Sequence, residues 1–490
     1  MNKLIKLSAL LAAIGGLLPA CTLTNDNTTD PRPNIVFAIM DDATYLHMGA
    51  YGCQWVNTPN FDRVAREGLL FQNAYTNNAK CAPSRSIILT GRHSWQLEEA
   101  SNHWPIFPAK FKVITEVLDE QGYAVGSTGK GWGPGVAYHA DSSWRNLMIK
   151  TYNEITTTAP TSKISARDYA ANFEVFMEER EAGQPFFFWY GGHEPHRAYE
   201  YGSGIEKGGK RLDQIKDEDI PSFWPVNDSI KTDLLDYALE IEYFDRHLGR
   251  ILESLERRGE LENTMVVVTA DNGMPFPRIK AQMYEYSNHL PLAVMWPGGI
   301  KNAGRVVEDF VSFIDLVPTF LEVTDMDAST TGMQAITGRS FVDILQGSEG
   351  APVDPMRRGV VFGKERHDIG RPDNWGYPIR GMIKGEMIYL YNFEVDRWPA
   401  GNPETGYLAT DGSPTKTVLL NGLNDVEGFP YWQQNFGKRP TEELYNLAED
   451  PSCVNNLVLQ EGYQTMATSM RDELFQLLTD QQDPRMLGQG

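Results

Sequence analysis

The chain has 490 residues, of which 41% are hydrophobic, and it carries a formal net charge of −21. This length allows one large domain and a smaller one, each with an apolar core. The excess of acidic residues argues against nucleic acid as a partner. A polyanionic ligand fits such a chain only where basic side chains are concentrated in one cleft, which the net charge does not describe.

The first 32 residues differ from the rest of the chain. Lys3 and Lys6 precede an apolar run, residues 7–18, which is too short to span a bilayer as a mature helix. The run leads into Leu-Pro-Ala-Cys, which resembles a bacterial lipobox, so residues 1–21 are predicted to be a signal segment with lipidation at Cys21. Residues 22–32 are polar and are predicted to form a tether. We expect export to the periplasm or outer membrane of a bacterium, with this anchor as the one link to the membrane; the alternative is simple secretion.

Short apolar runs alternate with helical patterns through most of the chain. Residues 35–40 form a continuous apolar run, which is typical of a strand buried on both faces of a parallel sheet. Thr58 and Pro59 then begin a helix that Gly68 ends. The alternation predicts an α/β domain over residues 33–350, built on a mostly parallel mixed sheet. Further strands are expected at 123–127, 186–190, 265–269 and 292–296, and further helices at 113–121, 166–181, 229–258 and 315–323.

The pattern changes after about residue 350, where strands and helices no longer alternate. Strands are expected at 387–393 and 443–445, and a terminal helix at 461–479. The stretch 395–440 is rich in Gly, Pro and Asn and is predicted to be loop. The sequence therefore predicts a smaller α+β domain over residues 351–490, packed on the first domain.

Two acidic pairs follow predicted strands. Asp41-Asp42 comes after the first strand, and Asp271-Asn272 comes after the strand at 265–269. Parallel sheets bind ligands at the carboxyl ends of their strands, so we expect these pairs to meet in space. Three carboxylates and an amide oxygen suit a hard cation such as Ca²⁺ or Mg²⁺ better than Zn²⁺. Taken alone, an acidic pair at a strand end is more often a helix cap or a solvated turn.

The most specific segment of the sequence begins at Cys81. It reads Cys-Ala-Pro-Ser-Arg and is followed by Thr90-Gly91, which resembles the signature of the sulfatase family. The resemblance implies an alkaline-phosphatase-like domain and the oxidation of Cys81 to formylglycine by a separate maturation enzyme. It also implies one divalent cation, expected to be Ca²⁺, with the ligands Asp41, Asp42, Asp271, Asn272 and the modified Cys81.

Other segments, at residues 33–37, 58–62 and 443–451, resemble the family along nearly the whole chain, with two departures. Gly129-Lys130 is similar to the segment with a catalytic lysine, but Trp132 stands where sulfatases usually carry a histidine that contacts the formylglycine hydroxyl. We expect either that Lys130 acts without this histidine or that His103 or His139 takes the place of the histidine. Lys280 stands where one branch of the family has an arginine, so a positive charge is retained.

The resemblance also implies roles for individual side chains. If a helix begins at Cys81, Arg85 returns to the same face and holds the formylglycine diol and the cation ligands. Lys130 and Lys280 are expected to bind sulfate oxygens. His196 is the expected general acid that protonates the leaving amine or alcohol. The predicted catalytic residues are thus Cys81, Arg85, Lys130, His196 and Lys280; the predicted substrate contacts are His193, Arg197 and Lys280, with His289 and Glu285 as weaker candidates.

The chemistry explains why a sulfatase uses an aldehyde. Enzymes lower activation barriers by roughly 8–23 kcal/mol. One hydroxyl of the hydrated aldehyde attacks sulfur and displaces the amine or alcohol. The other hydroxyl is then deprotonated, and sulfate leaves as the carbonyl re-forms, so water does not have to attack the sulfated intermediate. A cation polarises the sulfate oxygens and lowers the pKa of the attacking hydroxyl.

The leading substrate is indicated by two segments that resemble the heparan N-sulfatases (sulfamidases): residues 193–197, which read His-Glu-Pro-His-Arg, and residues 271–277, which end Pro-Phe-Pro. They predict release of sulfate from N-sulfoglucosamine in heparin or heparan sulfate. The alternatives are an O-sulfatase acting on 6-O-sulfated glucosamine or another ester, a phosphonate or phosphate ester hydrolase, and a non-catalytic glycan-binding lipoprotein. Cys53 and Cys453 could form a disulfide or remain free thiols.

Overall fold

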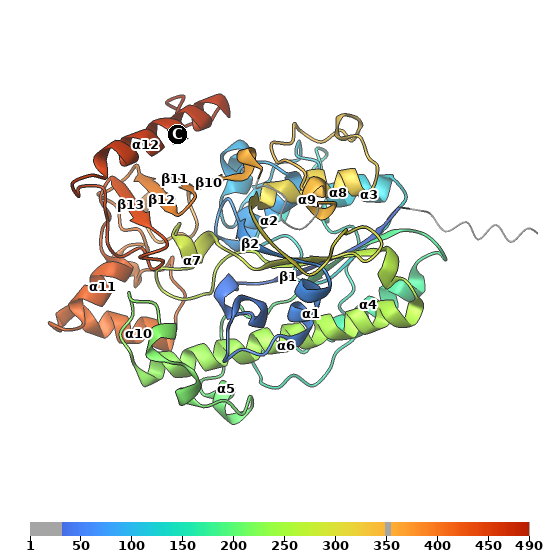
Figure 1. The fold of residues 1–490 in the computed structure, drawn as a ribbon, viewed down its shortest axis with the longest axis horizontal. Helices are drawn as coiled ribbons and strands as arrows, with labels where there is room; N and C mark the ends of the chain where they lie inside the picture. Colours follow the sequence, from blue (N-terminus) through green and yellow to red (C-terminus); the bar gives the residue numbers. More distant parts are fainter. Residues whose placement is uncertain (1–31, 348–353, 490) are drawn as a thin grey trace, which may run out of the picture.

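The computed structural model describes residues 32–347 and 354–489. Its centre is a seven-stranded sheet with the strand order β4-β6-β1-β7-β8-β2-β9 (Figure 1). Only β8 runs antiparallel to its neighbours, so the predicted mostly parallel mixed sheet is confirmed. The strands are β1 (Asn34–Met40), β2 (Leu69–Tyr75), β4 (Ala124–Gly129), β6 (Phe186–Gly191), β7 (Thr264–Ala270), β8 (Leu292–Met295) and β9 (Arg305–Ser312).

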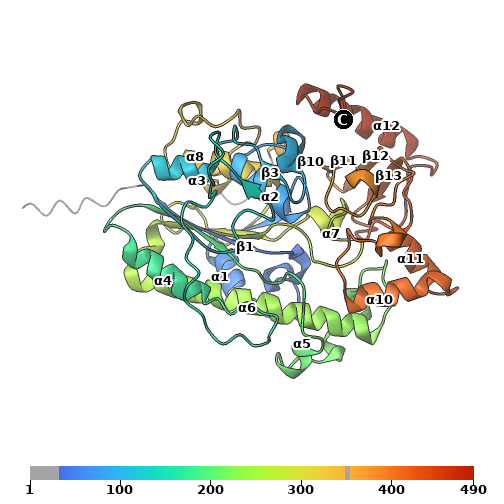
Figure 2. The ribbon, with the colours of Figure 1, turned by 180° about the vertical axis from the view of Figure 1, so that it is seen from behind.

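Helices cover both faces of this sheet, because successive side chains of each strand point to opposite faces. In β1, Val36 and Ala38 belong to one apolar cluster, and Ile35 and Phe37 belong to another. Figures 1 and 2 show α1, α4 and α6 along one face and α3 and α8 on the other. The first face carries α1 (Pro59–Glu67), α4 (Tyr169–Glu179) and α6 (Asp228–Arg258); the second carries α2 (Cys81–Thr90), α3 (Ile114–Glu120) and α8 (Leu316–Val323).

The helix ends follow local signals in the sequence. Pro59 is the first residue of α1 and Gly68 is its C-cap. The longest helix, α6, begins after Asn227, whose side chain accepts a hydrogen bond from Ser229 N, and it ends at Gly259, which has a positive φ of 70°. Apart from short 3-10 helices, this part also contains β3 (Ile106–Phe107), β5 (Val136–Ala137), α5 (Ser203–Glu206), α7 (Glu285–Asn288) and α9 (Val342–Leu345).

A second, four-stranded antiparallel sheet lies toward the C-terminus, in the strand order β10-β11-β12-β13 (Figure 1). One face packs on α12 through Leu444 and Leu474. The other shares an apolar cluster with Tyr75 and Met283 of the main part, so the two sheets are joined by a common core. The predicted boundary at residue 350 lies outside the described residues. These elements are β10 (Gly359–Lys364), β11 (Ile379–Lys384), β12 (Met387–Asn392), β13 (Glu442–Asn446) and α12 (Gln464–Asp480).

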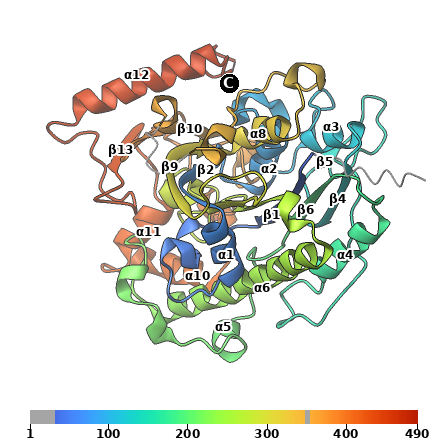
Figure 3. The same cartoon turned by 45° about the vertical axis from the view of Figure 1, so that its right-hand side comes forward.

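The prediction of loop over 395–440 is partly wrong. This stretch contains α10 (Pro414–Asn421) and α11 (Phe429–Phe436), and α10 packs against α6 (Figure 3). Both helices carry proline in the first turn, where the missing N–H costs nothing. The proline content that suggested loop therefore marks two helix starts.

The predicted signal segment, lipidation at Cys21 and nearly all of the tether lie outside the described residues. Within residues 32–347 and 354–489, every helix is too short or too polar to serve as a membrane span. Cys53 and Cys453 are both free thiols, so the open question about a disulfide between them is answered.

The carboxyl ends of β4 and β6 approach each other so closely that only glycine fits. A Cβ on Gly191 would lie 1.8 Å from the backbone oxygen of Lys130. We expect Gly191→Ala to lower the free energy of unfolding by about 1–3 kcal/mol, because the strand ends must separate. Gly412 has no atom within 4 Å of a built Cβ, so Gly412→Ala is the control and should change it by less than about 0.5 kcal/mol. Equal midpoints of thermal unfolding for the two variants would contradict this packing.

Candidate active site

The ends of two neighbouring parallel strands bring two acidic pairs together. Asp41 and Asp42 follow β1, and Asp271 and Asn272 follow β7. The backbone N–H of Asp42 donates to Asp271 Oδ1 at 3.0 Å, and Asn272 Nδ2 donates to Asp42 Oδ1 at 2.7 Å. All four side chains are buried. The site is therefore a cluster of carboxylates deep in the molecule.

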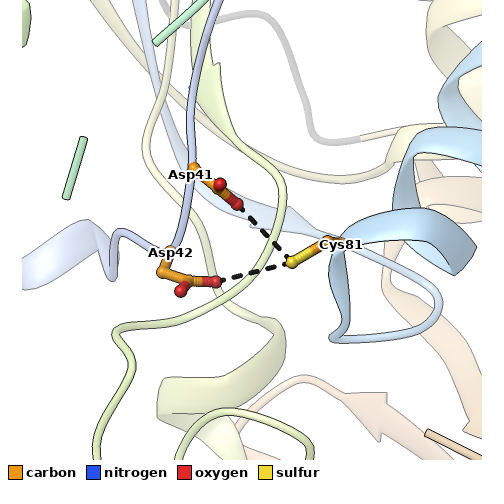
Figure 4. A group of neighbouring side chains, drawn as sticks. All are labelled: Asp41, Asp42 and Cys81. Carbon is orange, nitrogen blue, oxygen red and sulfur yellow. Dashed lines mark hydrogen bonds between the residues drawn. The ribbon is translucent and has the colours of Figure 1, made fainter. Parts of the chain in front are cut away.

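Cys81 is the first residue of α2 and points into this cluster (Figure 4). Its Sγ lies 3.5 Å from Asp41 Oδ1 and 3.9 Å from Asp42 Oδ1. Burial is the main cause that raises the pKa of the thiol, and the charge of Asp41 adds to it. The unmodified thiol therefore stays protonated at neutral pH and is a poor nucleophile.

Arg85 lies one turn further along α2 and is completely buried. Its Nε donates to Asp271 Oδ2 at 2.8 Å, and its Nη1 donates to the backbone oxygens of Lys130 and Gly131, both at 2.8 Å. Its Nη2 lies 3.8 Å from Asp41 Oδ1 and has no hydrogen-bond partner in the described part of the chain. Arg85 thus ties α2 to the segments that follow β4 and β7.

Two lysines complete the charge balance. Lys130 Nζ lies 2.6 Å from Asp41 Oδ2, and Lys280 Nζ lies 2.6 Å from Asp42 Oδ2. Burial favours the neutral form of Asp41, but Lys130, then His196 and Arg85, hold its pKa well below the usual range. Burial likewise opposes the charge of Lys130, yet Asp41 raises the pKa of this ammonium. Both partners therefore stay ionised in the interior.

The donor set fits a divalent cation. Ligand atoms of Asp41, Asp42 and Cys81 all lie within 4.8 Å of one another. Asn272 Oδ1 is buried and has no hydrogen-bond partner within residues 32–347 and 354–489, a state that costs free energy unless a donor or a cation faces the oxygen. Oxygen ligands of this kind are those that Ca²⁺ and Mg²⁺ prefer. The residues present thus fit the cation that the sequence predicts.

A cavity of about 620 Å³ opens beside the cluster and is large enough for a sugar ring. Asp41, Cys81, Lys130 and His196 line it. His196 Nε2 lies 3.9 Å from Asp42 Oδ2, and its side chain is 39% exposed, so it can meet a ligand. A larger cavity of about 890 Å³ lies around Cys53 and contains none of these groups.

Among the predicted substrate contacts, Arg197 uses its guanidinium to bind other parts of the protein. Its Nη1 and Nη2 donate to the two oxygens of Asp233 at 2.7 and 2.8 Å, and its Nε donates to Pro275 O. All three guanidinium nitrogens are therefore engaged within the protein. His193 also lines the cavity, where its Nε2 accepts a hydrogen bond from Arg167 Nη1 at 2.5 Å.

The weaker candidates His289 and Glu285 do not reach the cavity. His289 Nδ1 lies 2.5 Å from Glu285 Oε1, and its Nε2 lies 2.7 Å from Gln72 O. The imidazole also stacks between Tyr45 and Tyr75. The prediction of substrate contact for this pair is wrong, because their polar atoms bind each other and the backbone in a buried aromatic layer.

The structure distinguishes the two histidines considered in place of Trp132. The indole of Trp132 donates to Ser86 Oγ at 2.9 Å and does not line the cavity. His103 does line it, with Nδ1 held 2.9 Å from Asp368 Oδ1 and with a buried Nε2 that no described residue bonds. His139 is exposed and outside the cavity.

Three residues near the cluster were missed by sequence reasoning: Asp368, Asp411 and Arg167. Asp368 also pairs with Lys80, and Asp411 Oδ2 lies 3.0 Å from Lys280 Nζ. All three come from irregular segments, and no motif or periodicity singles them out. Asp368 and Asp411 reach the strand ends because tertiary packing brings the C-terminal part of the chain there, whereas Arg167 lies just before α4.

Comparisons with known proteins agree with this geometry. The human N-sulphoglucosamine sulphohydrolase is 26% identical over 486 residues, which cover 92% of this chain and 91% of the relative. The N-acetylglucosamine-6-O-sulfatase of Bacteroides thetaiotaomicron is 24% identical and covers 78% of this chain and 84% of its own. A solved structure of a protein in complex with its substrate D-glucosamine-2-N,6-O-disulfate has a TM-score of 0.62 and 20% identity, and it covers 92% of this chain and 98% of its own, which shows a shared fold.

The family profile named Sulfatase matches residues 33–326. This span holds Cys81, Arg85 and both acidic pairs, together with the strands that position them. The resemblance that the segment at Cys81 suggested is thereby confirmed at the level of the family. The chain belongs to the sulfatase family and is a sulfuric ester hydrolase.

Proposed function

We propose that this sulfatase removes sulfate from a glycosaminoglycan, with N-sulfoglucosamine of heparin or heparan sulfate as the leading substrate. The carrying observation is the position of Cys81, whose Sγ faces Asp41 and Asp42 at the wall of a cavity large enough for a sugar. Formylglycine at residue 81 would supply a hydroxyl nucleophile in place of the inert thiol. Its formation requires a separate maturation enzyme.

The cation of this proposal is Ca²⁺, held by Asp41, Asp42, Asp271 and Asn272 together with residue 81. When bound, such a cation withdraws charge from sulfate oxygens and lowers the pKa of a hydroxyl beside it. The protein's own basic side chains would bind the sulfate group. Lys130 and Lys280 stay charged, because Asp41 and Asp411 respectively are the main charges that raise the pKa of each ammonium against its burial, and both can bind sulfate oxygens.

Arg85 and His196 have complementary parts in the proposal. Arg85 is a positioning residue, since its bonds to Asp271 and to the Lys130 backbone fix the cluster. His196 is the proposed proton donor to the leaving group: its Nδ1 lies 2.5 Å from Arg197 O, which orients the ring, and its Nε2 lies 3.9 Å from Asp42 Oδ2 in a residue that lines the cavity. A substrate amine or alcohol would take its proton there.

The choice of N-sulfoglucosamine is supported by the segments at 193–197 and 271–277 and by the similarity to the human N-sulphoglucosamine sulphohydrolase. The main rival is a 6-O-sulfatase, because a relative with that name is 24% identical. The same proposal includes export and lipidation at Cys21, which rest on residues 1–21 alone.

We expect the purified protein to release sulfate from N-sulfoglucosamine faster than from glucosamine 6-sulfate, measured by ion chromatography. Cys81→Ala should abolish release from both sugars, because alanine supplies no precursor of the nucleophile. Cys53→Ala is the matched control, since this thiol is free and lies at the other cavity, and it should keep full activity. Release from the 6-sulfate alone would replace the substrate assignment by the O-sulfatase. Full activity of Cys81→Ala would refute the nucleophile.

We expect His103→Ala to lower kcat/KM by at least about tenfold, the size of a lost hydrogen bond of roughly 1.5–3 kcal/mol to a charged group. His103 lines the cavity and is oriented by Asp368, and its Nε2 has no hydrogen-bond partner among the described residues. His139→Ala should leave kcat/KM within about twofold of wild type, because His139 lies outside the cavity. If both variants retain wild-type kinetics, Lys130 acts without a histidine partner.

A further inference from the structure

Two basic side chains that line the active-site cavity have no carboxylate partner among the described residues. The basic residues of its lining include Lys130, Arg197, Lys163 and Arg167. Lys130 is paired with Asp41, and Arg197 is paired with Asp233. Within the described part of the chain, neither Lys163 nor Arg167 has a carboxylate oxygen within 4.0 Å. The lining therefore combines basic side chains that are paired with a carboxylate and basic side chains that are not.

One acidic residue of the lining contacts the segment just before Arg167 without pairing with it. Glu194 also lines the cavity, but its Oε1 accepts from Ser165 N at 2.9 Å and its Oε2 accepts from the hydroxyl of Tyr169 at 2.8 Å. Both carboxylate oxygens are thus used by neutral donors. The charge of the guanidinium remains available to a ligand.

Arg167 is nevertheless held in place. Its backbone pairs with Thr156 in an isolated bridge, and its N–H donates to Ser165 Oγ at 3.2 Å. Its Nη1 donates to His193 Nε2 at 2.5 Å. Burial lowers the pKa of His193 to about 4, so the ring is neutral at pH 7 and accepts this bond without cancelling the charge. The rest of the guanidinium fork is free of protein acceptors in the described residues.

Arg167 lies close to the groups of the proposed catalytic cluster. Asp41, Lys130 and Arg85 all act electrostatically on His193, which binds Arg167 directly. The cavity volume of about 620 Å³ is larger than one sulfate group occupies and leaves room for a substituted sugar. A guanidinium fork matches the paired oxygens of sulfate and carboxylate groups.

We propose that Arg167, with Lys163 beside it in the cavity lining, forms a second anion subsite that binds another sulfate or carboxylate group of the same glycan. The inference rests on the proposed function, because it takes the sulfated glycan as the ligand. It names the substrate class more narrowly: a sugar, or a disaccharide, that carries an anionic group besides the sulfate to be removed.

The test measures binding to a protein that cannot turn over the ligand. Isothermal titration of Cys81→Ala and of Cys81→Ala/Arg167→Gln uses three probes: N-sulfoglucosamine, glucosamine N,6-O-disulfate, and a disaccharide of a uronate with N-sulfoglucosamine. We expect Arg167→Gln to weaken binding of at least one doubly anionic probe by tenfold or more, while N-sulfoglucosamine changes by less than twofold. Arg167→Lys, which keeps the charge without the fork, should fall between.

The pattern of loss identifies the group. Loss for the disulfate alone assigns a second sulfate, and loss for the disaccharide alone assigns a carboxylate. The subsite would be overturned if the two proteins bound every probe with equal affinity or if Arg167→Gln weakened all three probes equally. It would also be overturned if none of the three probes bound. Arg66→Gln, an exposed substitution outside the cavity, is the control and should change nothing. Since the readout is binding, a failure of sulfate release leaves this result interpretable.

Discussion

The burial of Asp41, Asp42 and Asp271 at the strand ends is the constraint on which the rest of the site depends. Carboxylates removed from water are tolerated only with close cations and good geometry. Arg85, Lys130 and Lys280 supply those cations from three different segments. With Asp411, four carboxylates face three fixed cations, which leaves one negative charge. A bound divalent cation would reverse that sign, and the site would then attract a sulfate monoester.

The same constraint reconciles an acidic protein with an anionic substrate. The net charge of −21 is a property of the whole chain, whereas the ligand meets only the lining of one cavity. Within that lining, arginines differ in what they can do. Arg197 uses all its nitrogens on Asp233 and Pro275 and supports the wall, while Arg167 keeps an open fork. Counting basic residues in the sequence cannot separate these roles.

The features that were predictable from sequence are local ones. The apolar run at 35–40, the proline that begins α1 and the glycine that ends α6 each act within a few residues, and the segment at Cys81 identifies the family. Asp368, Asp411 and Arg167 were not predictable, because their positions follow from packing between distant parts of the chain. The antiparallel direction of β8 lacks a distinctive local signal, and the prolines that begin α10 and α11 are equally typical of turns.

The most direct test of the buried charge cluster is the metal content of the fully matured protein, measured by elemental mass spectrometry after equilibration with Ca²⁺ and removal of free ions. The account predicts one divalent cation per wild-type chain and a marked loss in Asp271→Ala, which removes a carboxylate that Arg85 and Asp42 orient. Wild-type protein that carries formylglycine at residue 81 yet retains no divalent cation would contradict it.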